Sequence, residues 1–186
     1  MPRRFVSGAA ALLMFTVIAE TSACSRGAAP AVTGEGAQSP ATLAQVMRGI
    51  LFPNSNVIFA AQHDEFAQVK PDADTSLSTD PIKGVYGGWE AVENSSLAIV
   101  EATQLITVPG RKCLNGRPVP LQDPEFIKFV ADLRSAGLLA YKAAQSKDQD
   151  QILDAAEKLG VACSHCHTAY REKPPEKGGE ANRCTK

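Results

Sequence analysis

The chain has 186 residues, a formal net charge of −1 at pH 7 and an aromatic content of 6%. The nearly neutral charge gives no electrostatic reason to expect nucleic-acid binding. The length allows one domain with a single core once an N-terminal segment is set aside. Few aromatic residues and many Ala and Leu residues favour closely packed helices over a β-sandwich, so we expect an all-α fold.

Residues 1–23 have the pattern of an export signal. Arg3 and Arg4 precede an apolar stretch, Phe5–Ala19, which is too short and too early for a membrane-spanning helix. Small residues then lead to Cys24. Two interpretations of Cys24 stay open: it lies beside an ordinary cleavage site, or it carries a lipid that anchors the protein to a membrane. Either way the mature protein is expected in the periplasm.

The first predicted helix follows a tether. Residues 24–38 are rich in Gly, Ala and Ser and show no apolar period, which is typical of a flexible segment. Ser39 and Pro40 suit an N-cap and a first helical position. Apolar residues then recur at steps of three and four as far as Ala61. Pro53 interrupts this pattern and predicts a kink or two shorter helices.

Two further segments follow a polar connection at residues 63–84. The apolar period predicts a second helix from about Tyr86 to Ile106, with Trp89 in the core. Residues 109–122 contain three prolines and two glycines and are expected to form a loop.

The last two predicted helices begin with good caps. Asp123 and Pro124 start a third helix, and a fourth runs from about Gln149 to Lys173, where a pair of prolines stops it. Four helices with at least one short connection favour an antiparallel four-helix bundle over residues 39–175. Residues 176–186 would be a C-terminal tail.

The fourth predicted helix contains a Cys-x-x-Cys-His motif made by Cys163, Cys166 and His167. This pattern is the one used for covalent haem attachment: two thiols bond the vinyl groups of one haem and the adjoining His binds its iron. On a helix the three residues lie at i, i+3 and i+4, so they share one face. The motif predicts one haem c per chain.

Two other interpretations of the motif have less support in the sequence. A thiol–disulfide redox pair usually opens a helix in a βαβ setting, which the sequence does not contain. A zinc site needs four ligands, and Cys163, Cys166, a His and Cys184 could supply them, but a second close ligand pair is missing.

The string from Cys163 to Arg171 (CSHCHTAYR) resembles the cytochrome c prime family, the class II c-type cytochromes. That family has a CxxCHxx(Phe/Tyr)(Arg/Lys) segment, which Tyr170 and Arg171 match, and the resemblance covers residues 40–173. It implies a haem inside a four-helix bundle. Some members have a five-coordinate iron that binds NO or CO, whereas others have a Met of the first helix as sixth ligand. The resemblance also implies a role for Arg171 near the haem and a homodimer.

Met47 is the candidate sixth ligand. In an antiparallel bundle the start of the first helix and the end of the fourth lie at the same end. Met47 is about six residues after the start of the first helix, and His167 is about six residues before the end of the fourth. Both therefore lie roughly 9 Å from that end of the bundle, measured along its axis. An inward Met is also ordinary core filling, and that alternative stays open. Arg48, next in the chain, is expected to point elsewhere.

The remaining cysteines suggest a disulfide. With Cys163 and Cys166 on a haem and Cys24 lipidated or removed, Cys113 and Cys184 are left in an oxidising compartment. Bundle topology puts the loop carrying Cys113 at the end where the fourth helix finishes, just before Cys184. We therefore expect these two residues to pair.

The functional expectation is an exported monohaem cytochrome that carries single electrons between redox partner proteins. The alternative is a five-coordinate haem protein that binds or scavenges NO or CO. No acid–base residue is evident for a haem enzyme, so catalysis is not expected.

Overall fold

The computed structural model describes residues 39–63, 69–70, 73 and 86–186. The predicted export signal, Cys24 and the tether lie outside the described residues, as does most of the polar connection. Within the described part the chain is mostly helical and forms no strand, so the all-α prediction is confirmed. One isolated antiparallel bridge joins Lys112 to Pro118 in the predicted loop. None of the described helices is long and apolar enough to cross a membrane.

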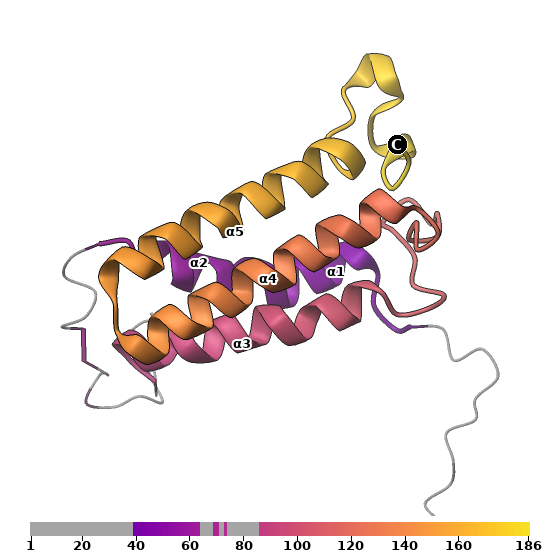
Figure 1. Cartoon of the computed structure of the whole chain (residues 1–186). Helices are drawn as coiled ribbons and strands as arrows, with labels where there is room; N and C mark the ends of the chain where they lie inside the picture. The colour runs from indigo at the N-terminus through magenta and orange to yellow at the C-terminus, as the bar shows by residue number, and fades with distance from the viewer. Residues whose placement is uncertain (1–38, 64–68, 71–72, 74–85) are drawn as a thin grey trace, which may run out of the picture. The chain divides into compact units, whose positions relative to one another are not determined.

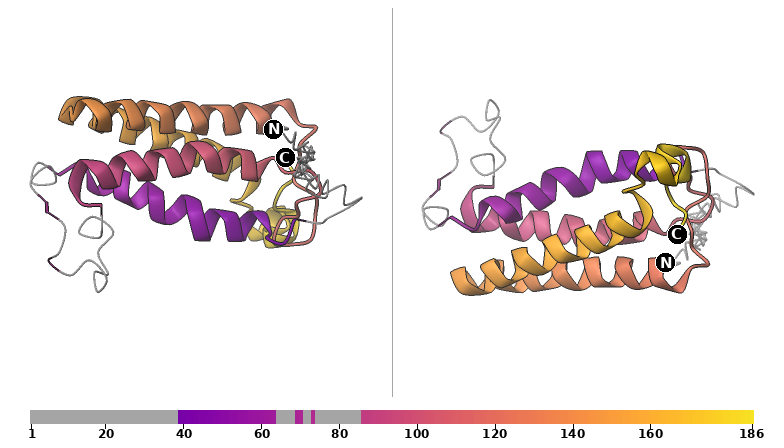
Figure 2. Two further views of the ribbon diagram at one scale, coloured as in Figure 1. Left: turned by 90° about the horizontal axis from the view of Figure 1, so that it is seen from below. Right: turned by 90° about the horizontal axis from the view of Figure 1, so that it is seen from above.

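Four helical rods pack against one another (Figures 1 and 2). The helices are α1 (Leu43–Val46), α2 (Phe52–Ala60), α3 (Gly88–Ile106), α4 (Pro124–Ser146) and α5 (Gln149–Tyr170), and a π-helical segment (Met47–Leu51) joins α1 to α2. We call α1, the π segment and α2 together the first helix. The chain reverses direction between successive rods, as the views of Figure 2 show, and the most extensive packing is between α3 and α4 and between α4 and α5.

The first helix begins three residues later than the sequence analysis expected. Its N-cap is Thr42, not Ser39. Thr42 and Gln45 form a capping box: the Gln45 amide donates to the Thr42 hydroxyl at 3.3 Å, and the Thr42 amide donates to the Gln45 side chain at 2.8 Å. This reciprocal pair satisfies two helix-end donors, an advantage that Ser39 lacks.

The irregularity expected at Pro53 takes the form of the π segment that precedes it. Pro53 has no N–H to donate to a carbonyl one turn back. The chain changes register before reaching it, and the Phe52 amide bonds the Met47 carbonyl five residues earlier. The Asn54 side chain then donates to the Ile50 carbonyl at 2.6 Å. The disturbed turn thus keeps its polar groups paired.

Helix α4 begins where the sequence predicted, and α5 ends earlier. The Asp123 carboxylate caps α4 by accepting from the Glu125 amide at 2.9 Å. Helix α5 ends at Tyr170, although Lys173 was expected. The Tyr170 carbonyl instead accepts the Cys184 amide at 2.7 Å, so the returning tail ends the helix before the prolines are reached.

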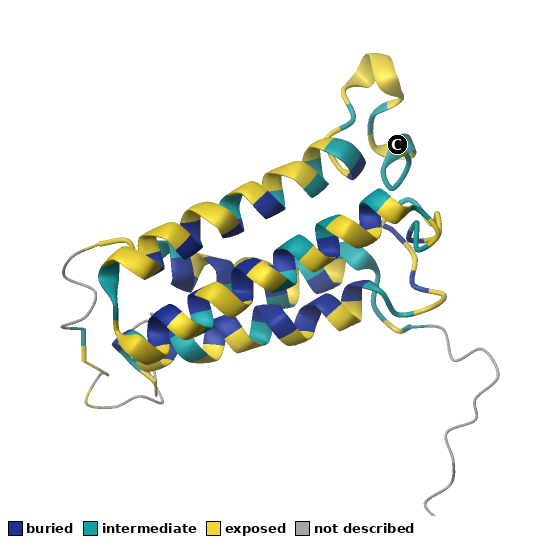
Figure 3. Cartoon of the chain, viewed as in Figure 1, coloured by how far each residue is buried: buried dark blue, intermediate teal, exposed yellow. Residues whose placement is uncertain are grey.

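The core lies between the four rods, where the buried faces meet (Figure 3). In α4 the apolar residues that recur at helical spacing are buried: Phe126, Val130, Leu133, Ala140 and Ala144. Trp89 is half-buried and packs against this core, in line with its expected structural role. Side-chain hydroxyls in the core bond their own helix, as Ser96 does to the Val92 carbonyl at 2.7 Å.

Candidate functional site

The CxxCH motif occupies the last two turns of α5. Cys163, Cys166 and His167 are half-buried, whereas Ser164 and His165 between them are exposed. Both thiols are free. The helix therefore presents the two sulfurs and the imidazole on its inner side, as their i, i+3 and i+4 spacing predicts.

These three residues line a cavity of 560 Å³ inside the bundle. That volume is within the usual range of ligand pockets, about 300–1,000 Å³. Most of its wall is apolar. Large apolar side chains of the wall come from the first helix, α4 and α5 and include Met47, Leu51, Phe52, Phe59, Phe126, Phe129, Leu133 and Tyr170.

The helices leave room for the cavity because α5 diverges from the first helix. Helix α5 packs along α4 but meets the first helix mainly through α2, with no comparable packing on α1 or the π segment. Figure 1 shows the end of α5 at the same end of the bundle as α1. The opening between them is where Cys166 and His167 lie on one side and Met47 on the other.

The π segment explains why one row of side chains, spaced four residues apart, lines the cavity along the whole first helix. Five wall residues recur at every fourth position: Leu43, Met47, Leu51, Ser55 and Phe59. In a regular α-helix such a row rotates by about 40° at each step and soon leaves the cavity. A π turn contains more residues than an α turn, so it rotates the row back. The row stays on one face because the register changes at Met47–Leu51.

Met47 and Arg48 both reach this cavity. Met47 is half-buried and lines the same space as His167, as the height argument predicts. The expectation for Arg48 was wrong, because this side chain is also part of the wall. The cavity spans two neighbouring rows of the first helix, and the second row contains Ala44, Arg48, Phe52 and Asn56.

Burial sets the protonation state of the motif. Desolvation raises the pKa of both thiols, and the pKa of Cys166 reaches about 11 with a further contribution from Cys163. Desolvation, followed by the nearby charge of Arg171, lowers the pKa of His167. The imidazole is therefore neutral at pH 7, which is the form that binds a metal ion.

The same facts argue against a thiol–disulfide redox pair. Reactive pairs of that kind have lowered thiol pKa values, often at a helix N-terminus. Here both pKa values are raised. The pair also lies in the last turns of α5, where the helix dipole disfavours a thiolate.

The residues weighed for a zinc site are not assembled. Cys184 forms a disulfide with Cys113, the pairing that the sequence predicted, with Cα atoms 6.5 Å apart. A disulfide sulfur is not available as a thiolate ligand. In the described ranges no group of three or more His, Cys, Asp and Glu side chains is arranged to hold a metal ion. The donor set at Cys163, Cys166 and His167 therefore fits a haem better than a bare cation.

Tyr170 fastens the end of α5 to the beginning of α4. Its buried ring packs edge-on against Phe126 at 5.2 Å, and its hydroxyl donates to the Asp123 carboxylate at 2.6 Å. This bond is the largest cause of the lowered pKa of Asp123, and burial and the same carboxylate raise the pKa of Tyr170. Tyr170 thus holds the last turn of α5 in place.

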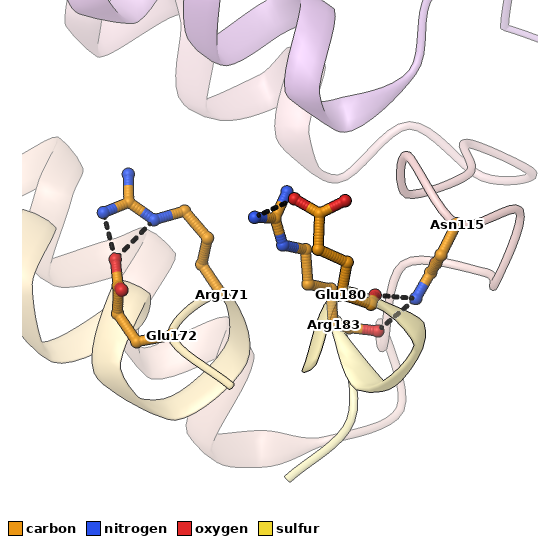
Figure 4. A network of polar contacts seen from close by, with 5 residues as sticks. All are labelled: Asn115, Arg171, Glu172, Glu180 and Arg183. Atoms are coloured by element: carbon orange, nitrogen blue, oxygen red, sulfur yellow. Dashed lines mark hydrogen bonds and ion pairs between the residues drawn. The ribbon is translucent and has the colours of Figure 1, made fainter. Parts of the chain in front are cut away.

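A set of contacts between the 109–122 loop and the tail closes the same end of the bundle, and we call it the clasp. Besides the disulfide it contains the Asn115 side chain, which donates to the carbonyls of Glu180, Ala181 and Arg183 at 3.0–3.1 Å. Figure 4 shows the contacts with Glu180 and Arg183. The clasp puts two tail residues, Arg183 and Cys184, into the cavity wall. Sequence reasoning missed Arg183, and the only signal for it was its position next to a cysteine with a predicted partner.

Arg171 lines the cavity from the C-cap of α5. Its guanidinium is exposed and pairs with the neighbouring Glu172. Exposed pairs of this kind contribute little to stability.

Comparison with protein-family models, with curated proteins and with solved structures finds no match to this chain. The resemblance to cytochrome c prime therefore depends on the motif residues and on the bundle that carries them.

Proposed function

We propose that this protein is an exported monohaem c-type cytochrome of the cytochrome c prime type, acting as a one-electron carrier in the periplasm. One observation carries the proposal: the thiols of Cys163 and Cys166, the His167 imidazole and the Met47 thioether all line one largely apolar cavity inside a four-helix bundle. A bound haem c would supply a one-electron ferric–ferrous couple.

The residues of the cavity have distinct roles in this proposal. Cys163 and Cys166 hold the cofactor covalently, and His167, neutral because it is desolvated, binds the iron. Met47 is the candidate sixth ligand, and a thioether there favours electron transfer over gas binding. The apolar wall excludes water from the iron. The proposal includes redox partner proteins and leaves membrane attachment through Cys24, a homodimer and the absence of catalysis as expectations.

The test is co-expression of the full chain with a haem c maturation system. We expect covalent haem on the wild-type protein and on His165→Ala, whose side chain is exposed and serves as the matched control. Cys163→Ser with Cys166→Ser should abolish covalent haem, measured by haem staining of denatured gels and by intact mass. A wild-type protein without covalent haem would contradict the proposal.

Optical spectra then separate electron transfer from gas binding. With Met47 on the iron, the ferric protein shows the weak long-wavelength band of a Met–iron bond, and Met47→Ala loses that band. A high-spin wild-type spectrum with rapid CO uptake would favour the five-coordinate alternative and exclude Met47 as a ligand.

A further inference from the structure

The residues that line the cavity include arginines but no acidic residue. Three guanidinium groups line the cavity, those of Arg48, Arg171 and Arg183, and no Asp or Glu is among the lining residues. Arg48 and Arg171 are exposed, whereas Arg183 is half-buried. A partly buried cation at the edge of a mainly apolar cavity gains from meeting anionic atoms. The wall therefore suits a ligand with an apolar body and more than one negative group.

Arg183 is the most firmly presented of the three. The backbone that follows its Cα is fixed. The Arg183 carbonyl accepts from Asn115 at 3.0 Å, and the next residue, Cys184, is held by its disulfide and by the Tyr170 carbonyl. Its side chain is 27% exposed. Figure 4 shows the guanidinium groups of Arg171 and Arg183 each beside the glutamate that it pairs with, Glu172 and Glu180 respectively.

Each of the three guanidinium groups can still bind a ligand, because in the described part of the chain its ion pair is either exposed or absent. Arg183 pairs at 2.7 Å with Glu180, whose side chain is 74% exposed, so that pair is weak. In the part of the chain that the structure describes, Arg48 of the first helix has no ion pair. Guanidinium groups can form two parallel hydrogen bonds with a carboxylate, the strongest polar contact available here.

We propose that Arg183, together with Arg48, binds the propionate carboxylates of the haem. The inference rests on the proposed function and extends it to residues outside the CxxCH motif. In this arrangement the disulfide and Asn115 hold in place a haem-binding arginine that follows the last bundle helix. A cation beside the cofactor also stabilises the reduced form relative to the oxidised form and raises the reduction potential.

The experiment compares reduction potentials and resonance Raman spectra of purified holoproteins. Arg183→Gln and Arg48→Gln should each lower the reduction potential and shift the propionate bending bands, and Arg183→Lys should recover much of the potential because it keeps the charge. Arg117→Gln is the matched control. Arg117 donates to the Ala181 carbonyl at 3.0 Å and so belongs to the clasp, but it does not line the cavity.

Each outcome decides the inference. Covalent haem with an unchanged potential and Raman spectrum in Arg183→Gln would overturn it and leave the proposed function intact. The same would follow if Arg117→Gln shifted both as strongly, since the clasp would then act through structure alone. A wild-type reduction potential that depends on added chloride, with the dependence lost in Arg183→Gln, would mean that Arg183 binds a free anion and not a propionate. That outcome would also overturn the inference. Absence of covalent haem would overturn both proposals.

Discussion

The two ends of the bundle are built from side chains of different size. Where α4 ends and α5 begins, these two helices contribute mainly alanines to the core, Ala140, Ala143, Ala155 and Ala156 among them, and all four are 0–2% exposed. At the other end Phe126, Phe129 and Tyr170 meet the first helix across a cavity. Small side chains let helices approach closely, and large ones hold them apart. One set of helices thus forms a closed end and an open end.

The two ends are also held together in different ways. The closed end is held mainly by apolar packing, to which the Gln149 side chain adds a hydrogen bond to the Ala61 carbonyl at 2.9 Å. There α4 and α5 are joined through the left-handed residue Lys147. The open end uses a disulfide, the Asn115 contacts and the Tyr170–Asp123 bond. The cavity interrupts the core there, so polar and covalent contacts take over what packing does elsewhere.

The largest expected effect comes from breaking the disulfide at the open end. The double variant Cys113→Ser with Cys184→Ser opens a loop with a sequence separation of 71 residues. Chain entropy predicts a loss of about 4 kcal/mol in the free energy of unfolding. Chemical denaturation of the purified protein measures it, and amide exchange should rise in the tail and the 109–122 loop but not at the closed end.

Reductant provides the control for this variant. Dithiothreitol should lower the unfolding midpoint of the wild-type protein and leave that of the double variant unchanged. Equal midpoints for the wild type with and without reductant would mean that the disulfide contributes nothing to stability.

A smaller effect is expected from adding one methyl group to the α3–α4 interface. A Cβ at Gly137 would lie 3.0 Å from Val100 Cγ2 and 3.2 Å from Ile99 Cγ2, whereas a Cβ at Gly160 of α5 would have no neighbour within 4 Å. Gly160→Ala should stabilise the protein by about 0.5–1 kcal/mol through helix propensity. Gly137→Ala should destabilise it by about 1 kcal/mol, because crowding outweighs that gain. Thermal unfolding checks both, and equal stabilisation would contradict close packing there.

The smallest effect is the pH dependence of the Tyr170–Asp123 bond. The bond lowers the pKa of Asp123 below its ordinary 3.8, so the charged form is favoured in the folded protein. Its contribution to stability is therefore present above pH 3.8 and is lost as the pH falls through the lower folded pKa. Asp123→Asn keeps a good N-cap and removes the charge.

The expected result is a lower unfolding midpoint for Asp123→Asn at pH 7 and a difference that closes in acid. Midpoints measured across the acid range give this directly. A gap between the two proteins that stayed constant with pH would show that the carboxylate charge does not matter.

Much of this fold could be predicted from local signals. Asp123 and Pro124 mark the start of α4, and the apolar period identifies its buried face, because caps and periodicity act within a few residues. The start of the first helix was missed although its signal was present, since Thr42 and Gln45 have the spacing of a capping box. Pro53 predicted an irregular turn but not its type.

The motif residues of the site could also be predicted, but the wall around them only in part. Cys163, Cys166 and His167 are identified by spacing, and Met47 by its height in the bundle. Arg48 and Arg183 were not found, because their places depend on contacts between distant parts of the chain. Arg48 lines the cavity because the cavity is wide enough to touch two rows of the first helix. Arg183 lines it because the neighbouring Cys184 forms a disulfide with Cys113, 71 residues earlier in the sequence.

The π segment has a consequence for how the first helix could change. A π turn is equivalent to one residue inserted into an α-helix. If Met47–Leu51 became regular α-helix without losing a residue, everything before the segment would rotate by about 100° relative to α2. Leu43 would then turn away from the cavity, and the Thr42 cap with it. The row of residues facing the cavity therefore depends on the hydrogen-bond register of this segment as much as on its composition.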